Sequence, residues 1–554
     1  MIKIAEFRFL GTVSRIEFKR RDLAIMGSSL GLVIVGLVLY NLTGIIYLAG
    51  ASAVGAVGVL FMIIRPVLER DVAKTDINSN IPYFITAFAT LSVSAANRID
   101  MLELLSKKEK LGKIKDEIAK LVNLVKNWRR GLSEAAMFLS SRSPSEIFED
   151  FLARFGHAIN SGQDFEEFVN NEAETVMNNF ETTYISALYT FDLYKDLYVS
   201  MLLSFAFLIT FVMIMPILIS INIIQVLSLS LLTIVLGEAM LVYGIKVVLP
   251  NDPIWHDTGI KTPLQIKIRK YLILGGVASV LLAVISIALD LEAKLPFYFI
   301  IAIVVTPLFV PGYVGSKAEK MVAKKDEMFG SFIRSLAGSA AARGNMIIEA
   351  LKAIVLHDFG TLTVDIRALY RRLAYRINNV SSWRNFSADT GSHLIEVFSE
   401  SFVESVDLGA NADKAGAVVA DNFDRVIRLR KRRHASVTSY IGVLYGITGG
   451  LAFSLAIAFG VLQIINQVFA TFNVQSLNSF GIFVSQPQSS ILVIEAFILA
   501  ILLIHSFIAG TALKIADGGK VVHGLHHFVI MTWIVTGVMY GTLQVVKLIL
   551  GGSL

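Results

Sequence analysis

The sequence predicts an all-α polytopic membrane protein with about nine transmembrane helices and two duplicated cytoplasmic helical domains. Of its 554 residues, 55% are hydrophobic and only 17% are charged, whereas an average soluble domain carries about 25% charge. The apolar residues gather into long runs, which two charged blocks separate. A run of about 20 apolar residues can cross a hydrocarbon core of roughly 30 Å as a helix, which satisfies its own backbone hydrogen bonds in lipid.

Nine apolar runs have this length to within a few residues, and the first follows the cations Lys19, Arg20 and Arg21, which predicts an anchor and not a cleaved signal. The runs comprise residues 23–40, 45–64, 197–217, 223–248, 272–289, 297–313, 437–466, 491–513 and 528–550. The predicted domains are an N-terminal segment with two spans (1–64), a first charged block (65–196), spans three and four (197–248), a loop (249–271), spans five and six (272–313), a second charged block (314–436) and spans seven to nine (437–554).

The distribution of positive charge predicts the orientation, because cytoplasmic loops carry an excess of Lys and Arg. With the N-terminus in the cytoplasm, Lys294 is the one residue among 50 Lys and Arg that falls in an outer loop. The outer loop 467–490 contains no charged residue. We therefore expect a multi-pass protein of the cell membrane with a cytoplasmic N-terminus, a C-terminus outside and both charged blocks in the cytoplasm.

Both charged blocks are predicted to be helical, because apolar residues recur in them at helical spacing. The residues that carry this pattern are Ile118, Leu121, Val122 and Val125 in the first block and Ile366, Leu369, Leu373 and Ile377 in the second. Gly162, followed by polar residues, predicts a helix stop and a new start. A shift of about 247 residues places Phe84 on Phe332 and, with a slip of one, Gly162 on Gly409. We therefore predict a parallel internal duplication.

Each block has a basic leading half and an acidic trailing half. Residues 107–130 hold nine Lys and Arg against three acids, and residues 389–424 hold eight acids against Lys414. One interpretation is that each block pairs its charges internally. The alternative hypothesis is that the basic segments dock on an acidic surface of a cytoplasmic partner, since complementary charge sets encounter rate and register. The candidate docking residues are Lys113, Lys115, Lys120, Lys126, Arg129, Arg130, Arg367, Arg371, Arg372 and Arg376.

A run of cations lies directly before span seven and is predicted to anchor the protein to anionic lipid head groups. It contains Arg428, Arg430, Lys431, Arg432 and Arg433. Nucleic-acid binding is not expected from it, because no aromatic residues are interleaved. Glu238, inside span four, is the deepest intramembrane acid and must be paired or protonated. His505, inside span eight, is expected to be hydrogen-bonded within the bundle.

The sequence offers little for catalysis. The chain has no cysteine, which excludes thiolate nucleophiles and Cys-based metal sites. Gly519-Lys520 is followed by Val521 and lacks the upstream glycine of a phosphate-binding loop. The histidines at 523, 526 and 527 are expected to pack at the membrane interface, because no nearby carboxylate completes a metal site. We therefore expect no catalytic residue, no metal and no cofactor, and a protein that is not an enzyme.

The duplicated plan resembles the type II secretion protein F family, the membrane platform proteins of type IV pilus-like machines. The residues that carry the resemblance are Ile81, Pro82, Tyr83, Phe84, Ala87, Ala89 and Leu91, their second copy Phe332, Ile333, Leu336 and Ala337, and the turns at 161–164 and 408–411. The chain departs from the family pattern at Asn97, where a glycine commonly follows Ala95 and Ala96. Three spans after the second block are most similar to the archaeal branch.

The resemblance implies a scaffold that couples a cytoplasmic hexameric ATPase to the insertion of pilin-like or archaellin-like subunits into a filament, and possible rotation of that filament. It implies that this filament is an archaellum, with an adhesive archaeal pilus as the alternative. Membrane lipid and a second copy of the chain are further expected partners, and no nucleic acid is expected. Two other classes stay open: a secondary transporter with a site around Glu238, and a signalling scaffold without an ATPase.

Overall fold

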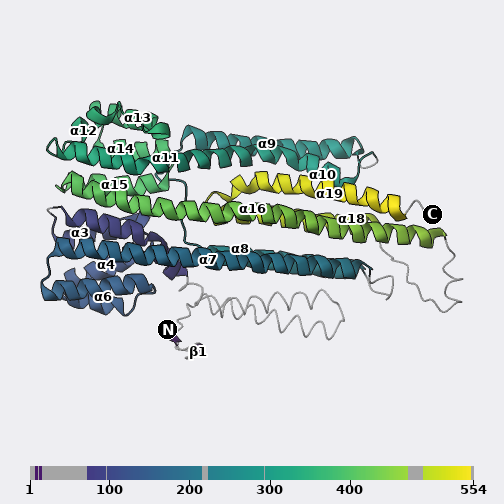
Figure 1. Ribbon diagram of the computed structural model, residues 1–554, viewed down its shortest axis with the longest axis horizontal. Coiled ribbons are helices and arrows are strands. Elements are labelled where there is room, and N and C mark those ends of the chain that lie inside the picture. Colours follow the sequence, from purple (N-terminus) through teal and green to yellow (C-terminus); the bar gives the residue numbers. More distant parts are fainter. Residues whose placement is uncertain are drawn as a thin grey trace.

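The computed structural model describes residues 7–9, 12–14, 72–94, 96–214, 223–291, 294–471 and 491–550. The molecule is elongated, with long helices along its length and the short helices of both charged blocks gathered at one end (Figure 1). Near the N-terminus, β1 (Phe7–Phe9) pairs with β2 (Thr12–Ser14) in antiparallel register. The first two predicted spans, 23–40 and 45–64, lie outside the described residues.

Seven helical segments among the described residues are long and apolar enough to cross a membrane. They are Phe165–Met213, Leu227–Val248, Pro263–Ala288, Phe297–Ala341, Ala412–Gln467, Ile491–Asp517 and Val521–Ile549. Each of them overlaps one of the predicted spans that follow residue 196. The predicted all-α membrane protein is therefore confirmed, whereas the total of nine spans stays a prediction.

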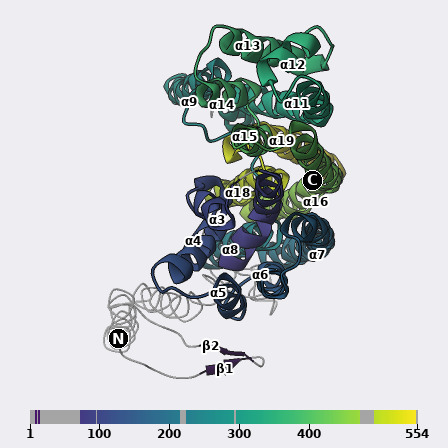
Figure 2. The same ribbon diagram turned by 90° about the vertical axis from the view of Figure 1, so that its left-hand side faces the viewer.

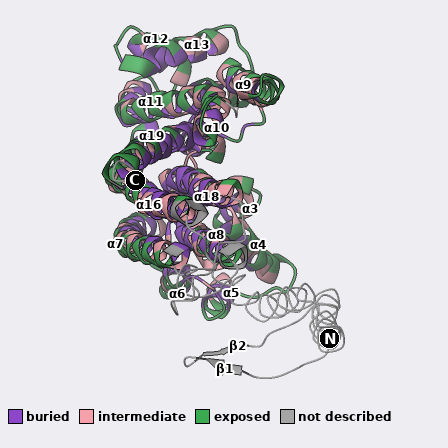
Figure 3. Ribbon diagram, turned by 90° about the vertical axis from the view of Figure 1, so that its right-hand side faces the viewer, coloured by how far each residue is buried: buried purple, intermediate pink, exposed green. Residues whose placement is uncertain are grey.

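The membrane bundle is built from long helices whose inner faces pack together and whose outer faces are apolar. The helices are α7 (Phe165–Ile214), α8 (Ile223–Val248), α9 (Pro263–Ala288), α10 (Phe297–Val305), α11 (Phe309–Ala341), α16 (Ala412–Thr471), α18 (Ile491–Asp517) and α19 (Leu525–Leu550). Figure 3 shows exposed residues along the outer faces and buried residues between the helices. Exposed Phe207 and Leu236 are examples of the outer faces. Lipid tails are as apolar as these side chains, so the outer faces of the helices are compatible with a lipid environment.

The first charged block begins with helical residues 72–92. It continues through α3 (Arg98–Ser106), η1 (Glu109–Leu111), α4 (Lys113–Lys126), α5 (Leu132–Ser140) and α6 (Glu146–Ser161). The side chain of Asn97 accepts a hydrogen bond from the backbone N–H of Ile99 and so caps α3. The predicted stop at Gly162 is confirmed, because this residue ends α6 with a left-handed φ of 69°.

The second charged block has the same order of elements. After α11 come α12 (Ile347–Ile354), η5 (Gly360–Leu362), α13 (Thr363–Ala374), α14 (Asn379–Thr390) and α15 (His393–Asp407). Three pairs of positions, each about 247 residues apart, share a positive φ: Gly112 and Gly360, Arg129 and Arg376, and Gly162 and Gly409. The common order is what a duplicated chain would show, and the duplication itself stays a prediction from the sequence.

The predicted apolar faces pack against the core in both blocks, with one exception. Ile118 and Leu121 are buried on α4, and Ile366 and Leu369 are buried on α13. The prediction is wrong for Ile377, which is 47% exposed. The helix ends at Ala374, and the left-handed backbone of Arg376 then turns the chain away before the next helical turn can form.

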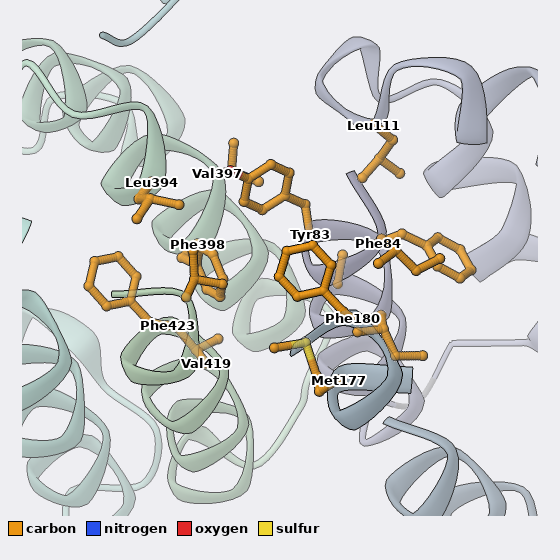
Figure 4. Close-up of a cluster of buried hydrophobic side chains, with 14 of the residues drawn as sticks. Tyr83, Phe84, Leu111, Met177, Phe180, Leu394, Val397, Phe398, Val419 and Phe423 are labelled. Carbon is orange, nitrogen blue, oxygen red and sulfur yellow. The ribbon is translucent and has the colours of Figure 1, made fainter. Parts of the chain in front are cut away.

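One hydrophobic core runs through both blocks. Viewed from the block end, α3 to α6 lie on one side and α11 to α14 on the other, with α15 and α16 between them (Figure 2). Tyr83 of the first block faces Phe398 of the second, and Phe398 in turn packs on Phe423 (Figure 4). The rings of Tyr83 and Phe398 meet edge to face at 5.9 Å. Each such buried side chain stabilises the fold by about 1.5–3 kcal/mol, so the blocks are held as one unit.

Candidate functional site

The predicted docking residues of the first block lie on and just after α4, and most of them pair within the block. Five of the six make ion pairs: Lys113 with Asp116, Lys115 with Glu109, Lys120 with Glu117, Lys126 with Glu103, and Arg130 with Glu134. Arg129 is exposed and has no ion pair among the described residues. Exposed pairs of this kind contribute only about 0–1 kcal/mol each, so their cations can be redirected to a partner at little cost.

Fewer of the predicted docking residues of the second block make ion pairs than those of the first block. Arg372 pairs with Asp389, with 2.6 Å between Nη2 and Oδ2. Arg367, Arg371 and Arg376 are exposed, and the described part of the chain provides no acid within ion-pair distance of them. The structure thus leaves four unpaired arginines on the two basic segments, one on the first and three on the second.

Two lysines outside that predicted set join the blocks to each other. Lys108 contacts Glu400 and Glu404 of α15, and Lys110 contacts Glu396 and Glu400 of the same helix. The distance from Lys110 Nζ to Glu396 Oε1 is 2.9 Å. The basic half of the first block therefore meets the acidic half of the second block within one chain.

Glu396 is the most enclosed acid of this junction. It is 2% exposed, and one of its oxygens accepts a hydrogen bond of 2.9 Å from the backbone N–H of Asp257. Burial alone would raise the pKa of Glu396, but nearby His393, the charge of Lys110 and the Asp257 N–H outweigh it and lower the pKa to about 2. Glu396 is therefore ionised at neutral pH. It holds Lys110 together with the connector, which is the segment 249–262 between α8 and α9.

A cleft of about 850 Å³ opens beside this junction, between α3 and η1 on one side and α14 and α15 on the other. Eight acidic side chains and four cations line it, among them Glu400, Asp407 and Arg384. The side chains of Glu400 and Glu404 are 41% and 28% exposed, so solvent screens their ion pairs, whereas the side chain of Glu396 is 2% exposed. No group of three or more His, Asp and Glu side chains in the described residues could hold a metal ion.

The prediction of a lipid anchor is wrong for Arg430. Its guanidinium group donates to both oxygens of Asp252 at 2.8 and 2.9 Å, lies 3.3 Å from Asp326 and also contacts the Pro253 carbonyl. Burial would raise the pKa of the Asp252 carboxyl, but the charge of Arg430 lowers it below its usual value. A guanidinium that is enclosed between two carboxylates cannot reach lipid head groups.

Arg433 likewise corrects the predicted anchor. It is 4% exposed and donates to the carbonyls of Ala516 and Ile515 in the last turn of α18, and to that of Pro250 just after α8. Cations stabilise helix C-termini because the carbonyls there lack intrahelical partners. The three remaining members of the run, Arg428, Lys431 and Arg432, are exposed, and their contact with lipid stays a prediction.

A buried carboxylate that the sequence did not single out lies beside the histidines at 523–527. Glu319 of α11 accepts from Lys514 Nζ at 2.8 Å, and its other oxygen lies 2.5 Å from His523 Nδ1. The indole N–H of Trp255 and the backbone N–H of Lys520 reach the same oxygen at 3.3 and 3.0 Å. Sequence reasoning missed this carboxylate because Glu319 lies about 200 residues before the histidines along the chain. The contacts of Glu319 join α11 to α18 and to the connector.

Glu238 meets His505 inside the membrane bundle. Both side chains are fully buried, and Glu238 Oε1 lies 2.5 Å from His505 Nδ1. The Thr448 hydroxyl donates to the Leu444 carbonyl at 2.7 Å, so it must accept from His505 Nε2 at 3.1 Å. His505 therefore donates from Nε2 to Thr448, while its Nδ1 faces Glu238. This contact links α8 to α16 and α18 and provides the partner that the sequence requires for Glu238.

Comparisons with known proteins place this arrangement in a family. The chain is 36% identical over 495 residues to the flagella accessory protein J of Methanocaldococcus jannaschii, which covers 88% of each chain. It is 35% identical over 476 residues to the protein of the same name from Methanococcus voltae, with 85% of each chain covered. The chain belongs to the flagella accessory protein J family. The expected resemblance is thereby confirmed.

A second comparison concerns part of the chain. Residues 84–214 match the family of type II secretion system protein F. In this member of the flagella accessory protein J family, that segment comprises most of the first charged block and the whole of α7. No solved structure matches the chain.

The junction residues Lys108, Lys110 and Glu396 are the main functional candidates that sequence reasoning missed in this family member. One signal could have found them: the basic half of one copy is complementary in charge to the acidic half of the other. The arrangement provides buried ionic contacts that hold long helices, both blocks and the connector in one frame.

Proposed function

We propose that this chain couples a cytoplasmic hexameric ATPase to the insertion of filament subunits at the base of an archaellum. Its family and its match to type II secretion system protein F make it a membrane platform protein of the archaellum and type IV pilus-like machinery. The proposal assigns the chain a mechanical role and no catalytic step. An adhesive archaeal pilus is the alternative machine.

The observation that carries this proposal is the continuity of the long helices from the blocks into the membrane bundle. The predicted boundary between block and span at residue 196 falls inside α7, which runs unbroken from Phe165 to Ile214. α16 runs over 60 residues, from Ala412 to Thr471, which corresponds to a length of about 90 Å. A displacement imposed on the blocks is therefore carried into the bundle without an intervening flexible linker.

The shared core supports the same role. The edge-to-face contact of Tyr83 with Phe398 and the pairs of Lys110 with Glu396 and Glu400 hold the blocks against each other. A force on either block therefore moves both of them. We place the blocks and the N-terminus in the cytoplasm and the C-terminus outside, with Arg428, Lys431 and Arg432 near lipid head groups. The ATPase would meet the basic segments, and two copies of the chain would lie on the machine axis.

A proline in α16 between block and bundle tests the coupling. Thr438 is exposed, and Thr438→Pro would remove a helical hydrogen bond and kink the helix there, at a cost of about 3 kcal/mol. We expect cells with this variant to retain ATPase binding and to lose filaments, whereas Thr438→Ala should assemble them normally. Normal filaments with the proline variant would show that α16 does not transmit the motion.

A further inference from the structure

Two turns at equivalent positions in the two blocks share an uncommon composition. α4 is followed by Trp128 and Arg129, and α13 is followed by Tyr375 and Arg376. Both pairs are separated by the same shift of about 247 residues that relates the blocks. Each turn therefore places an aromatic side chain and then an arginine within three residues of the end of the helix that carries the basic segment.

The arginine of each turn has a left-handed backbone. Arg129 has φ of 52° and Arg376 has φ of 56°. The backbone N–H of the residue after each arginine donates back to the preceding helix, from Arg130 to Leu124 at 3.1 Å and from Ile377 to Arg372 at 3.1 Å. These are helix-ending turns, a position at which glycine is favoured because it lacks a Cβ.

The same blocks use glycine where only the backbone matters. Gly162 ends α6 with φ of 69°, and Gly409 follows α15 with φ of 89°. A Cβ added at either glycine would meet no atom within 4 Å. The two arginines thus occupy a conformation that is unfavourable for them, which points to a role of their side chains besides the turn itself.

The aromatic residues before them are exposed to an unusual degree. Trp128 is 71% and Tyr375 is 81% exposed. Neither Arg129 nor Arg376 makes an ion pair with any residue that the structure describes. Exposed aromatic residues beside unpaired arginines are the composition of binding hot spots, in which Trp, Tyr and Arg are enriched.

We infer that these two turns are twin contact points for two identical subunits of one oligomeric partner. The inference rests on the proposed coupling to a ring-shaped ATPase and identifies where the ring is held. Each turn would insert its aromatic ring into an apolar pocket and direct its guanidinium at a carboxylate beside it. The partner surface is acidic, because Arg129 and Arg376 have no ion pair among the described residues and the equally unpaired Arg371 lies close to the second turn.

The repetition argues for identical subunits. Two turns with the same backbone and the same pair of side chains fit the same pocket, and a ring of identical subunits presents that pocket at regular intervals. Binding of one turn would raise the local concentration of the second pocket, so the pair gains affinity beyond that of either contact. A monomeric partner would offer only one pocket and would bind much more weakly.

The test replaces each arginine by glycine, which is the residue that the left-handed backbone conformation favours. Full-length chain in lipid nanodiscs is measured for binding to the hexameric ATPase of the same machine, as wild type, Arg129→Gly, Arg376→Gly and the double variant. We expect each single variant to bind at least about 10-fold more weakly and the double variant at least about 100-fold more weakly. The unfolding temperature should not fall, so weaker binding cannot be ascribed to loss of fold.

Lys352→Ala is the matched control for charge, since Lys352 is an exposed cation of α12 outside both turns, and it should bind within about twofold of wild type. A monomeric form of the ATPase should bind the wild-type chain no more tightly than the ring binds a single variant. Unchanged binding of the double variant to the ring would overturn this inference and leave the proposed function standing. Failure of the wild-type chain to bind the ring would contradict the proposed function, and this inference with it.

Discussion

Arginines of α16 and arginines of the two block turns occupy opposite environments. Arg430 and Arg433 are enclosed and hold carboxylates and helix-end carbonyls of segments that are distant in sequence. Arg129 and Arg376 lie in solvent on left-handed turns and hold nothing within the described residues. A buried guanidinium requires all of its partners, so the first pair maintains the fold. The second pair is free for another molecule.

The largest expected effect is at the enclosed arginines. Arg430→Ala would leave the buried carboxylate of Asp252 without its cation and would also remove the partner of Asp326, whose pKa burial raises to about 7. The free energy of unfolding should therefore fall by about 3–5 kcal/mol. Thermal unfolding of the protein in detergent, followed by tryptophan fluorescence, measures this. Arg428→Ala, on an exposed position of the same helix, should change it by no more than about 0.5 kcal/mol. Equal losses for both variants would mean that enclosure does not distinguish these arginines.

The junction between the blocks should be next in size. Glu396→Gln would replace a charged acceptor by a neutral one and should lower the free energy of unfolding by about 2 kcal/mol at pH 7. Glu400→Gln serves as the comparison, since Glu400 is 41% exposed and its loss is screened by water. A larger effect at Glu400 than at Glu396 would show that the cleft, and not the enclosed carboxylate, holds the junction.

The same carboxylate predicts a dependence on pH. The folded pKa of Glu396, about 2, lies below its ordinary value of 4.5, so its contribution is complete above about pH 4.5 and is lost as the pH falls towards 2. Unfolding temperatures measured between pH 6 and pH 3 should therefore fall more steeply for wild type than for Glu396→Gln. If the unfolding temperatures of wild type and Glu396→Gln fell equally over this pH range, the lowered pKa of Glu396 would be contradicted.

The intramembrane pair should contribute less, because contacts between polar groups in membrane bundles average about 0.6 kcal/mol and reach about 1.7 kcal/mol. A double-mutant cycle with Glu238→Ala and His505→Ala isolates the coupling, which we expect to be about 1–1.5 kcal/mol. Lys246→Ala, an exposed position of α8, provides the control. Strict additivity of the two single losses would show that the 2.5 Å contact stabilises nothing.

The smallest effect should have the opposite sign. Arg129→Gly and Arg376→Gly each relieve a left-handed conformation and should raise the free energy of unfolding by about 0.5–1 kcal/mol. Gly162→Ala, which imposes a Cβ on a left-handed position with open space around it, should lower the free energy of unfolding by about 1 kcal/mol. A loss of stability in both arginine variants would mean that these side chains serve the fold.

The sequence by itself determined the membrane class, the span positions after residue 196 and the helical nature of the blocks. Hydropathy and helical spacing are local properties, and the long apolar runs and the Gly162 stop follow from residues that are close along the chain. The polar partner of Glu238 could be expected, because an isolated charge in lipid is too costly. That His505 would be this partner could not, since 267 residues separate them.

The tertiary structure alone decided which of many similar cations are enclosed and which are free. Arg428 and Arg430 are two residues apart, yet only the second faces Asp252 of the connector and Asp326 of α11. Likewise Lys110 and Lys113 lie in the same basic segment of the sequence, but only Lys110 contacts α15. Such differences depend on the rotation of each helix about its axis and on which distant segment packs against it. Both are set by long-range packing, which local residue patterns do not encode.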